Sequence, residues 1–326
     1  MTKSFLAMTI GLLVAGCSMA PDYQRPEVPQ GASWQVTSDA KSNLGWQQQF
    51  SDPTLQSLIR SALENNRDLR LAALNVQSYE AQYRIQRAAQ LPTLAVGASS
   101  SRQQTSGDLN GTGAEQISSQ HSAEVGITAY ELDLFGRNQS LSRAARETWL
   151  ASEFTAQNTR LTMVSELTTA WVTLAADNSN LALAKSTMES AANSLKIVKR
   201  QQDVGVAAAT DVSSAMAVYQ QARASVASYR TLVMQDKNAL NLLAGDTVPD
   251  NLLPGTLESL SDNAITLIPA GVSSSTLLRR PDIAAAEAQL VAANARIGVA
   301  RSAYFPSIGL SAGLGSASLE LSKLFT

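Results

Sequence analysis

Cysteine and histidine are nearly absent from this sequence, which contains one of each among 326 residues. A single cysteine excludes a disulfide framework within the chain. The sequence also has no nucleophile elbow, no metal-ligand spacing and no phosphate-binding loop. Its closest approach to a glycine-rich motif, Gly111 with Gly113, is a short pair in a polar stretch and is typical of a turn. We therefore expect neither an enzyme nor a bound metal or cofactor.

An excess of charge of either sign is missing too. The 25 basic and 27 acidic residues leave a net charge of -2, so no electrostatic attraction for nucleic acid is expected. Aromatic residues make up only 5% of the chain, whereas Ala, Leu and Gln, which favour helix, are abundant. After the N-terminus the longest uncharged run, residues 263–278, contains Pro269 and Gly271. No later segment is therefore expected to span a bilayer as a helix, and a crossing would require β-strands.

The N-terminus has the pattern of a bacterial lipoprotein signal. Residues 5–15 form an apolar stretch that is too short to span a membrane as a helix. The stretch ends in Val14-Ala15-Gly16-Cys17, which resembles a lipobox. A lone cysteine is usually a buried, inert thiol, but its position directly after the apolar stretch favours lipidation. We predict a signal peptide over 1–16 and a Cys17 that carries N-palmitoyl and S-diacylglycerol lipid, and Ser18 after it is typical of sorting to the outer membrane.

Two helices are expected between residues 51 and 92. Asp52 and Pro53 form a typical helix start, an N-cap followed by proline at the first helical position, and this helix should end near Glu64. A second helix begins at Asp68 and ends before Pro92, because proline disfavours helix in the residue before it. Its seven-residue repeat consists of Leu69, Val76 and Tyr83, with Ala72 and Tyr79 between them.

Two strands are expected next. Apolar side chains alternate with small or polar ones over 93–99 and again over 123–134, which is the period of a strand. The second alternation slips by one residue near Tyr130, and a bulge or a bend would explain the slip. Residues 100–121 are rich in Ser, Gln and Gly and predict a polar loop. His121 at the end of that loop is expected to be solvated, without a metal-binding or catalytic role.

The strongest signal is a run from Arg137 to Gln202 that contains no proline and no glycine. A helix of this length would extend about 100 Å at 1.5 Å per residue. Its second half carries a heptad pattern in which only Asp177 is not apolar. The heptad residues are Leu167, Ala170, Leu174, Asp177, Leu181, Ala184, Met188, Ala191, Leu195 and Val198.

A glycine-centred turn at residues 203–207 separates this helix from a second one. The second helix is expected to begin near Thr210 and Asp211, both plausible N-caps, and to end at Gly245. Its heptad residues are Ala215, Tyr219, Ala222, Val226, Tyr229, Val233, Asp236, Leu240 and Leu243. Because the two heptads lie at similar distances from the turn, we predict an antiparallel coiled-coil hairpin. Such a hairpin is by itself compatible with many functions.

The sequence repeats itself at an offset of 214 residues. Residues 68–98 align without gaps with residues 282–312, and each segment reads as helix, proline and strand. The identical pairs include Asp68/Asp282, Ala72/Ala286, Ala81/Ala295, Arg87/Arg301, Pro92/Pro306 and Ala98/Ala312. A period this long indicates a duplicated half rather than a solenoid. Since the chain stops at Thr326, just past the first strand of the second repeat, the sequence predicts that its C-terminal third is missing and that its last strand is unpaired.

Several motifs resemble the lipoprotein branch of the TolC-type outer-membrane factor family, the OprM-like or NodT-type proteins. They are Cys17 with Pro21-Asp22-Tyr23, Asn65-Asn66-Arg67-Asp68-Leu69-Arg70, Tyr83-Arg84-Ile85-Gln86-Arg87, Glu131-Leu132-Asp133-Leu134-Phe135-Gly136, Arg279-Arg280-Pro281-Asp282-Ile283 and Phe305-Pro306-Ser307-Ile308. Together these motifs span essentially the whole chain.

The resemblance implies a mainly α, TolC-like channel-tunnel with a minor membrane β part. In this family three protomers form one 12-stranded outer-membrane barrel, to which each complete protomer gives four strands, and a periplasmic tunnel of long helices. The implied function is the lipid-anchored outer-membrane exit duct of a tripartite, RND-type multidrug efflux system, through which small molecules leave passively. The implied partners are two further chains of the same kind, a periplasmic adaptor (membrane fusion protein), an inner-membrane RND transporter and outer-membrane lipid, but no nucleic acid.

Functional residues follow from the resemblance only at the hairpin tip. Val204, Gly205, Val206 and Ala207 resemble the tip that meets the adaptor, and their small apolar side chains suit close packing. The family's gate lies largely on a second hairpin that this sequence lacks. The chain is therefore expected to be an incomplete copy that cannot close its barrel and is inactive in export.

The domains expected on this basis follow the chain. They are a signal peptide (1–16), a lipidated extended segment (17–50), periplasmic helices (51–92), a first β-hairpin (93–134), the long helical hairpin (135–245), a linker (246–281), the start of the second repeat's helix (282–306) and a third strand (307–326). An alternative function is a periplasmic lipoprotein adaptor or scaffold, which would also have a helical hairpin. The small-residue strands that flank the hairpin favour the channel.

Overall fold

The computed structural model describes residues 18–26, 45–111, 113–261, 264–266 and 274–325. These residues form two compact units. The described part of the first contains residues 18–26, 76–152 and 285–325, and that of the second contains residues 45–75 and 153–284 apart from the gaps above. The predicted signal peptide and Cys17 lie outside the described residues. Within them, no helix combines the length and the hydropathy that a membrane span requires.

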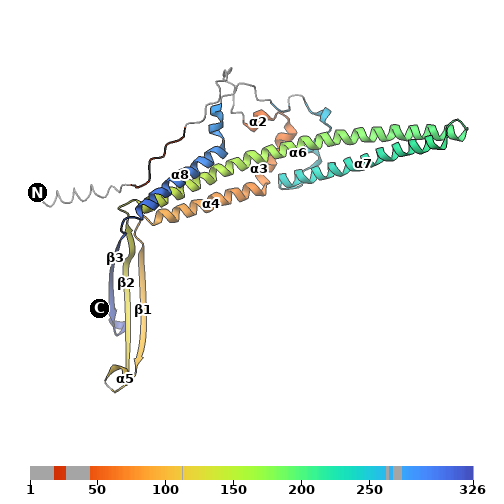
Figure 1. Ribbon diagram of the computed structural model, residues 1–326. Coiled ribbons are helices and arrows are strands. Elements are labelled where there is room, and N and C mark those ends of the chain that lie inside the picture. Colours follow the sequence, from red (N-terminus) through yellow and green to blue (C-terminus); the bar gives the residue numbers. More distant parts are fainter. Residues whose placement is uncertain (1–17, 27–44, 112, 262–263, 267–273, 326) are drawn as a thin grey trace. The chain divides into compact units, whose positions relative to one another are not determined.

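The elements follow the predicted order of helices, two strands, a helical hairpin, a helix and a strand (Figure 1). They are α2 (Trp46–Gln49), α3 (Pro53–Asn65), α4 (Arg67–Ala88), β1 (Leu94–Thr105), α5 (Gly107–Asn110), β2 (Gln116–Leu132), α6 (Arg137–Asp203), α7 (Ala209–Ala244), the 3-10 turns η1 (Asp250–Leu252), η2 (Leu257–Ser259) and η3 (Ser274–Arg279), α8 (Pro281–Ser302), β3 (Ile308–Ser318) and η4 (Leu321–Lys323).

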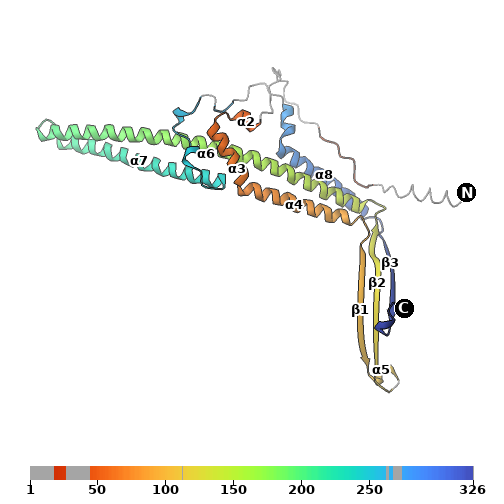
Figure 2. The ribbon, with the colours of Figure 1, turned by 180° about the vertical axis from the view of Figure 1, so that it is seen from behind.

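α6 and α7 confirm the predicted coiled-coil hairpin, and they run side by side in both views (Figures 1 and 2). Every predicted heptad residue of both helices is buried or half-buried. The predicted start of α7 is wrong by one to two residues, because the helix begins at Ala209. Asp211 lies at the third helical position, where its carboxylate accepts the N–H of Ala208 at 3.0 Å. The carboxylate thus accepts a hydrogen bond from a backbone N–H that has no partner within the helix.

The core of the second unit lies between α3, α6 and α7. Asp52 caps α3 as predicted, accepting the N–H groups of Thr54 and Leu55 at 2.8 and 2.9 Å. Below this cap α3 packs its apolar face against the hairpin. The largest fully buried side chains are those of Leu55, Leu58 and Ile59 of α3, Leu167, Trp171 and Leu174 of α6, and Leu240 of α7. Burial of large side chains here fixes α3 against the base of the hairpin.

A buried asparagine links α3, α4 and α7 in the same unit. The side chain of Asn66 accepts the N–H groups of Asp68 and Leu69 at 2.9 and 3.0 Å. It therefore caps α4, which begins at Arg67 rather than at the predicted Asp68. The amide of Asn66 also donates to the carbonyl of Leu243 at 2.8 Å, which ties the turn between α3 and α4 to the end of α7.

In the first unit, β1, β2 and β3 form one antiparallel sheet with β2 in the middle (Figure 2). The register runs without a break from Leu94 opposite Ile127 to Thr105 opposite Gln116. The polar loop predicted over 100–121 is therefore wrong for most of its length, because only residues 106–115 lie between the strands. Ladder hydrogen bonds use backbone groups, so serine and glutamine can continue a strand as well as apolar residues can.

A β-bulge explains the slip in alternation near Tyr130. The register of β2 on β3 shifts between Ile127, opposite Ala312, and Tyr130, opposite Leu310. Ala129 within the bulge has a φ of +54°. The additional residue returns Tyr130 to the face that Ile127 occupies, so the bulge predicted as one of two explanations is confirmed.

The duplicated elements have matching lengths. α4 and α8 each contain 22 residues and begin 214 residues apart, at Arg67 and Pro281. β1 and β3 also begin 214 residues apart, at Leu94 and Ile308. The prediction that the last strand is unpaired is wrong, because β3 pairs along its length with β2. The strand finds its partner within the chain's first half.

Candidate functional site

The tip of the α6–α7 hairpin is built by a helix end and a left-handed glycine. α6 ends at Asp203, and Gly205 follows with a φ of +80°, a conformation that other residues rarely adopt. The N–H groups of Val206 and Ala207 both donate to the carbonyl of Gln201, at 2.8 and 3.2 Å. These bonds give the Gln201 carbonyl in the last turn of α6 its hydrogen-bond partners. They also stabilise the turn that leads into α7.

The apolar side chains of the tip face outward. Val204 and Val206 are 74% and 77% exposed, and a Cβ placed on Gly205 would meet no atom within 4 Å. Ala207 is half-buried. The structure therefore brings the four predicted tip residues together in one tight turn whose valines form a small exposed apolar surface.

The hairpin seam contains two carboxyl groups, Asp177 of α6 and Asp236 of α7. The Oδ2 atom of Asp236 is shielded from solvent and has no hydrogen-bond partner. Burial raises the pKa of Asp236, and a hydrogen bond and the charge of Asp177 raise it further. These effects favour the neutral, protonated form of Asp236 in the folded protein.

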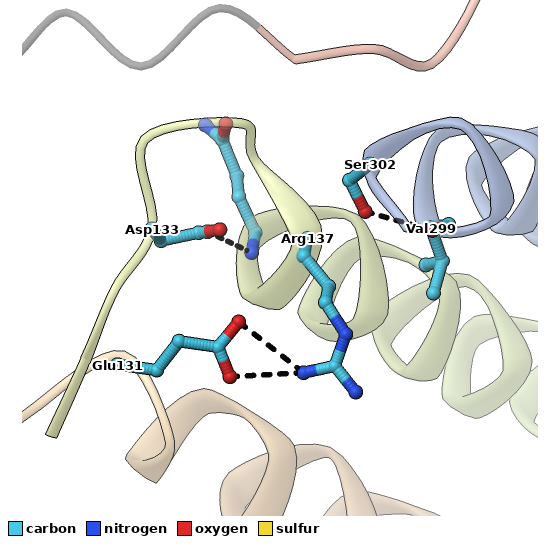
Figure 3. A network of polar contacts seen from close by, with 6 residues as sticks. Glu131, Asp133, Arg137, Val299 and Ser302 are labelled. Carbon is cyan, nitrogen blue, oxygen red and sulfur yellow. Dashed lines mark hydrogen bonds and ion pairs between the residues drawn. The ribbon is translucent and has the colours of Figure 1, made fainter. Parts of the chain in front are cut away.

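A polar network joins β2 to α6 in the first unit (Figure 3). Arg137 donates from Nη1 to Glu131 at 3.1 Å, and Asp133 accepts the backbone N–H of Gln139 at 2.7 Å. Asp133 thereby satisfies a free donor in the first turn of α6, where a negative charge is also favoured by the helix dipole. Sequence reasoning placed the junction here but did not identify these contacts.

The second repeat packs against the same junction. Phe135 stacks on Phe305, with ring centroids 4.3 Å apart and an interplanar angle of 12°. Beside the two rings, residues 131–135 and 305–307 together with Arg137 line a hollow of about 320 Å³. This arrangement fixes the start of α6 against the segment that leads into β3.

Residues 19–25, here called the N-terminal strap, lie along α8. Arg25 forms a bidentate ion pair with Glu287, with Nε 2.5 Å from Oε1, and Tyr23 donates to the same carboxylate at 3.5 Å. The Arg25 guanidinium lowers the pKa of Glu287 below its usual value. Asn294 donates to the carbonyl of Pro21 at 2.7 Å. No periodicity in the sequence reveals contacts between residues so far apart in the chain.

Gly298 allows the strap to approach α8 closely. A Cβ on Gly298 would lie 2.7 Å from the backbone nitrogen of Ala20 and from Oγ of Ser140. Arg301, one turn further along α8, donates to the carbonyl of Met19 at 3.4 Å. The chain that follows Cys17 is thus fixed beside the end of α8 that leads into β3.

His121 was expected to be solvated, but its side chain is partly shielded from solvent. His121 lies in β2 between Ser100 and Ser318, and its Nδ1 is shielded from solvent without a hydrogen-bond partner. Across the part of the chain that the structure describes, no group of His, Cys, Asp and Glu residues could hold a metal ion.

Comparison with known proteins gives the family. Residues 58–246 and 272–326 match the family model described as outer membrane efflux protein. The chain is 44% identical to the antibiotic efflux pump outer membrane protein ArpC of Pseudomonas putida, with 100% of this chain and 69% of that protein covered. It is 42% identical to the solvent efflux pump outer membrane protein SrpC of the same species, with 98% and 70% covered. It is 37% identical to the outer membrane protein OprJ of Pseudomonas aeruginosa, with 98% and 67% covered.

Solved structures show the same fold. A membrane protein from Pseudomonas aeruginosa superposes with a TM-score of 0.84 at 37% identity, over 95% of this chain and 70% of that one. CusC gives a TM-score of 0.80 at 35% identity, over 95% and 69%. The open-state MtrE outer membrane channel of Neisseria gonorrhoeae gives 0.74 at 37% identity, also over 95% and 69%. The predicted TolC-like fold of long helical hairpins with a few strands is confirmed.

These matches decide among the functions left open by the sequence. The family consists of transport proteins rather than enzymes, as predicted. Its members are outer-membrane channels that extend into the periplasm, which excludes the alternative of a periplasmic adaptor. The chain belongs to the outer membrane efflux protein family and is an outer-membrane channel component of a tripartite efflux pump.

Proposed function

We propose that this protein is the homotrimeric exit channel through which an RND-type pump expels antibiotics and organic solvents. The proposed cargo follows from relatives that export antibiotics and solvents and are 44% and 42% identical to this chain. The observation that carries the proposal is that one chain combines the long α6–α7 hairpin with an antiparallel sheet that has an exposed apolar surface. In this proposal the sheet contributes to the channel wall in the membrane and the hairpin extends the passage toward the pump.

Assembly into a trimer is supported by the sheet edges. The strand order β1-β2-β3 leaves one edge of β1 and one edge of β3 without a strand partner among the described residues. An unpaired edge in lipid is costly, because no water is present to satisfy its backbone groups. Further strands, including those of neighbouring protomers, would satisfy them. Chemical crosslinking of the detergent-solubilised protein should give trimers, and a strictly monomeric product would contradict the proposal.

Export is tested in a bacterial host that lacks its own efflux pumps but carries a cognate adaptor and RND transporter. Expression of the protein from its own gene should raise resistance to antibiotics and survival in toluene. The matched control is the same strain without the transporter, in which the passive channel should confer no resistance. Unchanged resistance in the complete strain, with the protein present in the outer membrane, would contradict the proposed function.

We infer that the hairpin tip docks onto the periplasmic adaptor. Its exposed valines and the bare backbone at Gly205 allow helix ends of a partner to pack closely. Gly205→Arg should abolish adaptor crosslinking and export while leaving membrane insertion intact. Gly205→Ala is the matched control, because it bears the same cost of a positive φ without the bulk or the charge. Full export by the Gly205→Arg protein would refute tip docking.

We propose further that Cys17 carries the lipid predicted from the lipobox, with N-palmitoyl and S-diacylglycerol groups. The strap supports this, since it holds the residues that follow Cys17 beside the end of α8 that leads into β3. Palmitate labelling should be lost in Cys17→Ser. Mass spectrometry that found the mature N-terminus elsewhere than at Cys17 would overturn the assignment.

A further inference from the structure

The two faces of the β1-β2-β3 sheet differ in chemistry. Directly opposed residues of antiparallel strands share a face, so the register assigns each side chain to one side. One face, here called the apolar face, includes Val96 at 81% exposure and Leu314 at 80%. Its apolar members are Leu94, Val96, Ala98, Ile117, Ala123, Val125, Ile127, Tyr130, Leu132, Ile308, Leu310, Ala312 and Leu314. The polar residues Ser100, Arg102, Gln104, Ser119, His121, Ser316 and Ser318 lie on the same side. An exposed apolar surface of this extent suits contact with lipid.

The opposite face, here called the small polar face, consists mainly of glycine, serine and glutamine. Its members are Ala95, Gly97, Ser99, Ser101, Gln103, Thr105, Gln116, Ser118, Gln120, Ser122, Glu124, Gly126, Glu131, Gly309, Gly313, Gly315 and Ala317. Only two of these residues carry a charge. Glu131 is paired with Arg137 at the end of the strand, so Glu124 is the one charged residue of this face, within the described strands, that has no ion pair.

Glu124 is surrounded by bare backbone. It lies on the middle strand directly between Gly97 of β1 and Gly315 of β3. A Cβ on Gly97 would come within 3.4 Å of Cγ and Oε1 of Glu124, so the carboxylate side chain extends over that glycine. The next row of the same face is also small, with Gly126 between Ala95 and Gly313. No neighbouring side chain in these rows screens the carboxylate.

The titratable groups nearest to Glu124 in the sheet point away from it. Arg102, the one basic residue of the three described strands, lies opposite Ser119 and therefore on the apolar side of the sheet. His121 belongs to that side as well, opposite Ser100. The small polar face therefore has a negative potential that no positive group of the strands compensates.

We propose that Glu124 sets the charge preference of the strand segment of the channel, favouring cationic and neutral solutes over anionic ones. The inference rests on the proposed function, because it requires that the small polar face lines the passage. Three copies in a trimer would place three carboxylates at one level of the channel. A charge on a low-dielectric wall acts over about a Debye length, roughly 10 Å at 0.1 M salt, so solutes that pass this level sense it.

The test is the reversal potential of single channels in planar bilayers under a potassium chloride gradient. The protein, expressed from its own gene, should be cation-selective at about 0.1 M salt. Glu124→Gln is nearly isosteric and should lower the potassium-to-chloride permeability ratio by about twofold or more, and Glu124→Lys should lower it further. The matched control is Glu115→Gln. It removes the same charge from a residue whose carboxylate binds Gln104, on the opposite side of the sheet, and should leave the ratio unchanged.

The outcomes separate this inference from the proposed function. Failure to observe channels at all, with correctly inserted protein, would count against the channel itself. Channels with a permeability ratio that is the same in wild type, Glu124→Gln and Glu124→Lys would overturn the role of Glu124 alone. A difference between wild type and Glu124→Gln that disappears in about 1 M salt would support an electrostatic cause, because the Debye length falls to about 3 Å. A difference that persists there would indicate altered shape and refute it.

Discussion

The close packing of Gly245 against the α3–α4 turn in the second unit can be tested by substitution. Gly245 ends α7 with a φ of +78°. A Cβ at this position would lie 2.3 Å from the carbonyl oxygen of Asn65 and 2.7 Å from its carbon. Both atoms belong to the backbone, so they cannot rotate away as a side chain would. Gly245→Ala should therefore displace the turn that carries the buried Asn66.

The expected cost has two parts. A residue other than glycine in the left-handed region costs about 1–2 kcal/mol, and overpacking against a fixed neighbour costs about 1–3 kcal/mol more. Displacement of the α3–α4 turn would also break the hydrogen bond from Asn66 to Leu243, which contributes about 1 kcal/mol. We expect Gly245→Ala to lower the free energy of unfolding by roughly 3–6 kcal/mol, the sum of these terms.

Gly205→Ala at the hairpin tip is the internal control. Its φ of +80° is nearly the same, but a Cβ there meets nothing within 4 Å, so only the backbone cost of about 1–2 kcal/mol remains. The assay is urea unfolding in detergent, followed by far-UV circular dichroism. The midpoint should fall by clearly more for Gly245→Ala than for Gly205→Ala. Equal midpoints would refute the reasoning, since they would mean that the contact with Asn65 has no energetic consequence.

Two further predictions concern the strap and the seam. Gly298→Leu should expel the N-terminal strap, because its side chain would occupy the positions of Ala20 N and Ser140 Oγ; limited proteolysis should then cleave residues 19–25 faster, whereas unchanged cleavage would contradict the packing. For Asp236 the folded state has a pKa above the ordinary value of 3.8, so it binds more protons than the unfolded state and stability should fall as pH rises from about that value through the raised pKa. Asp236→Asn should remove this slope and stabilise the hairpin at neutral pH by about 1 kcal/mol, because it removes a half-buried carboxylate that has one oxygen without a partner. An unchanged pH profile of thermal unfolding would count against the raised pKa.

The parts of the fold that sequence reasoning predicted correctly are those with local signals. The heptads of α6 and α7 depend on spacing alone, and every heptad residue is at least half-buried. The bulge at Ala129 was detectable because an apolar alternation makes a one-residue slip visible. The polar half of the β1–β2 hairpin was missed for the converse reason, since residues 100–105 carry no apolar alternation and their pairing depends on the backbone.

The missed features of the candidate sites depend on contacts between distant residues. The ion pair of Arg25 with Glu287 joins segments that are 262 residues apart, and neither residue belongs to a periodic pattern. The chemistry of the small polar face was visible only in part. The small residues of the strands that flank the hairpin were visible in the sequence, but the row of Gly97, Glu124 and Gly315 requires the register of three strands. Composition cannot supply a register, because each strand alone permits several.

The duplication explains which features had to be kept while the sequence diverged. α4 ends at Ala88 and β1 begins at Leu94, and α8 ends at Ser302 and β3 begins at Ile308, so both connectors have the same length. One additional residue in such a helix would rotate the strand that follows by about 100° and move it by about 1.5 Å. A shift of one residue in a strand would exchange the apolar and the small polar face. The spacing between helix and strand is therefore under stronger constraint than the identity of most residues within them, which is why the repeat was visible in the order of its elements despite few identical pairs.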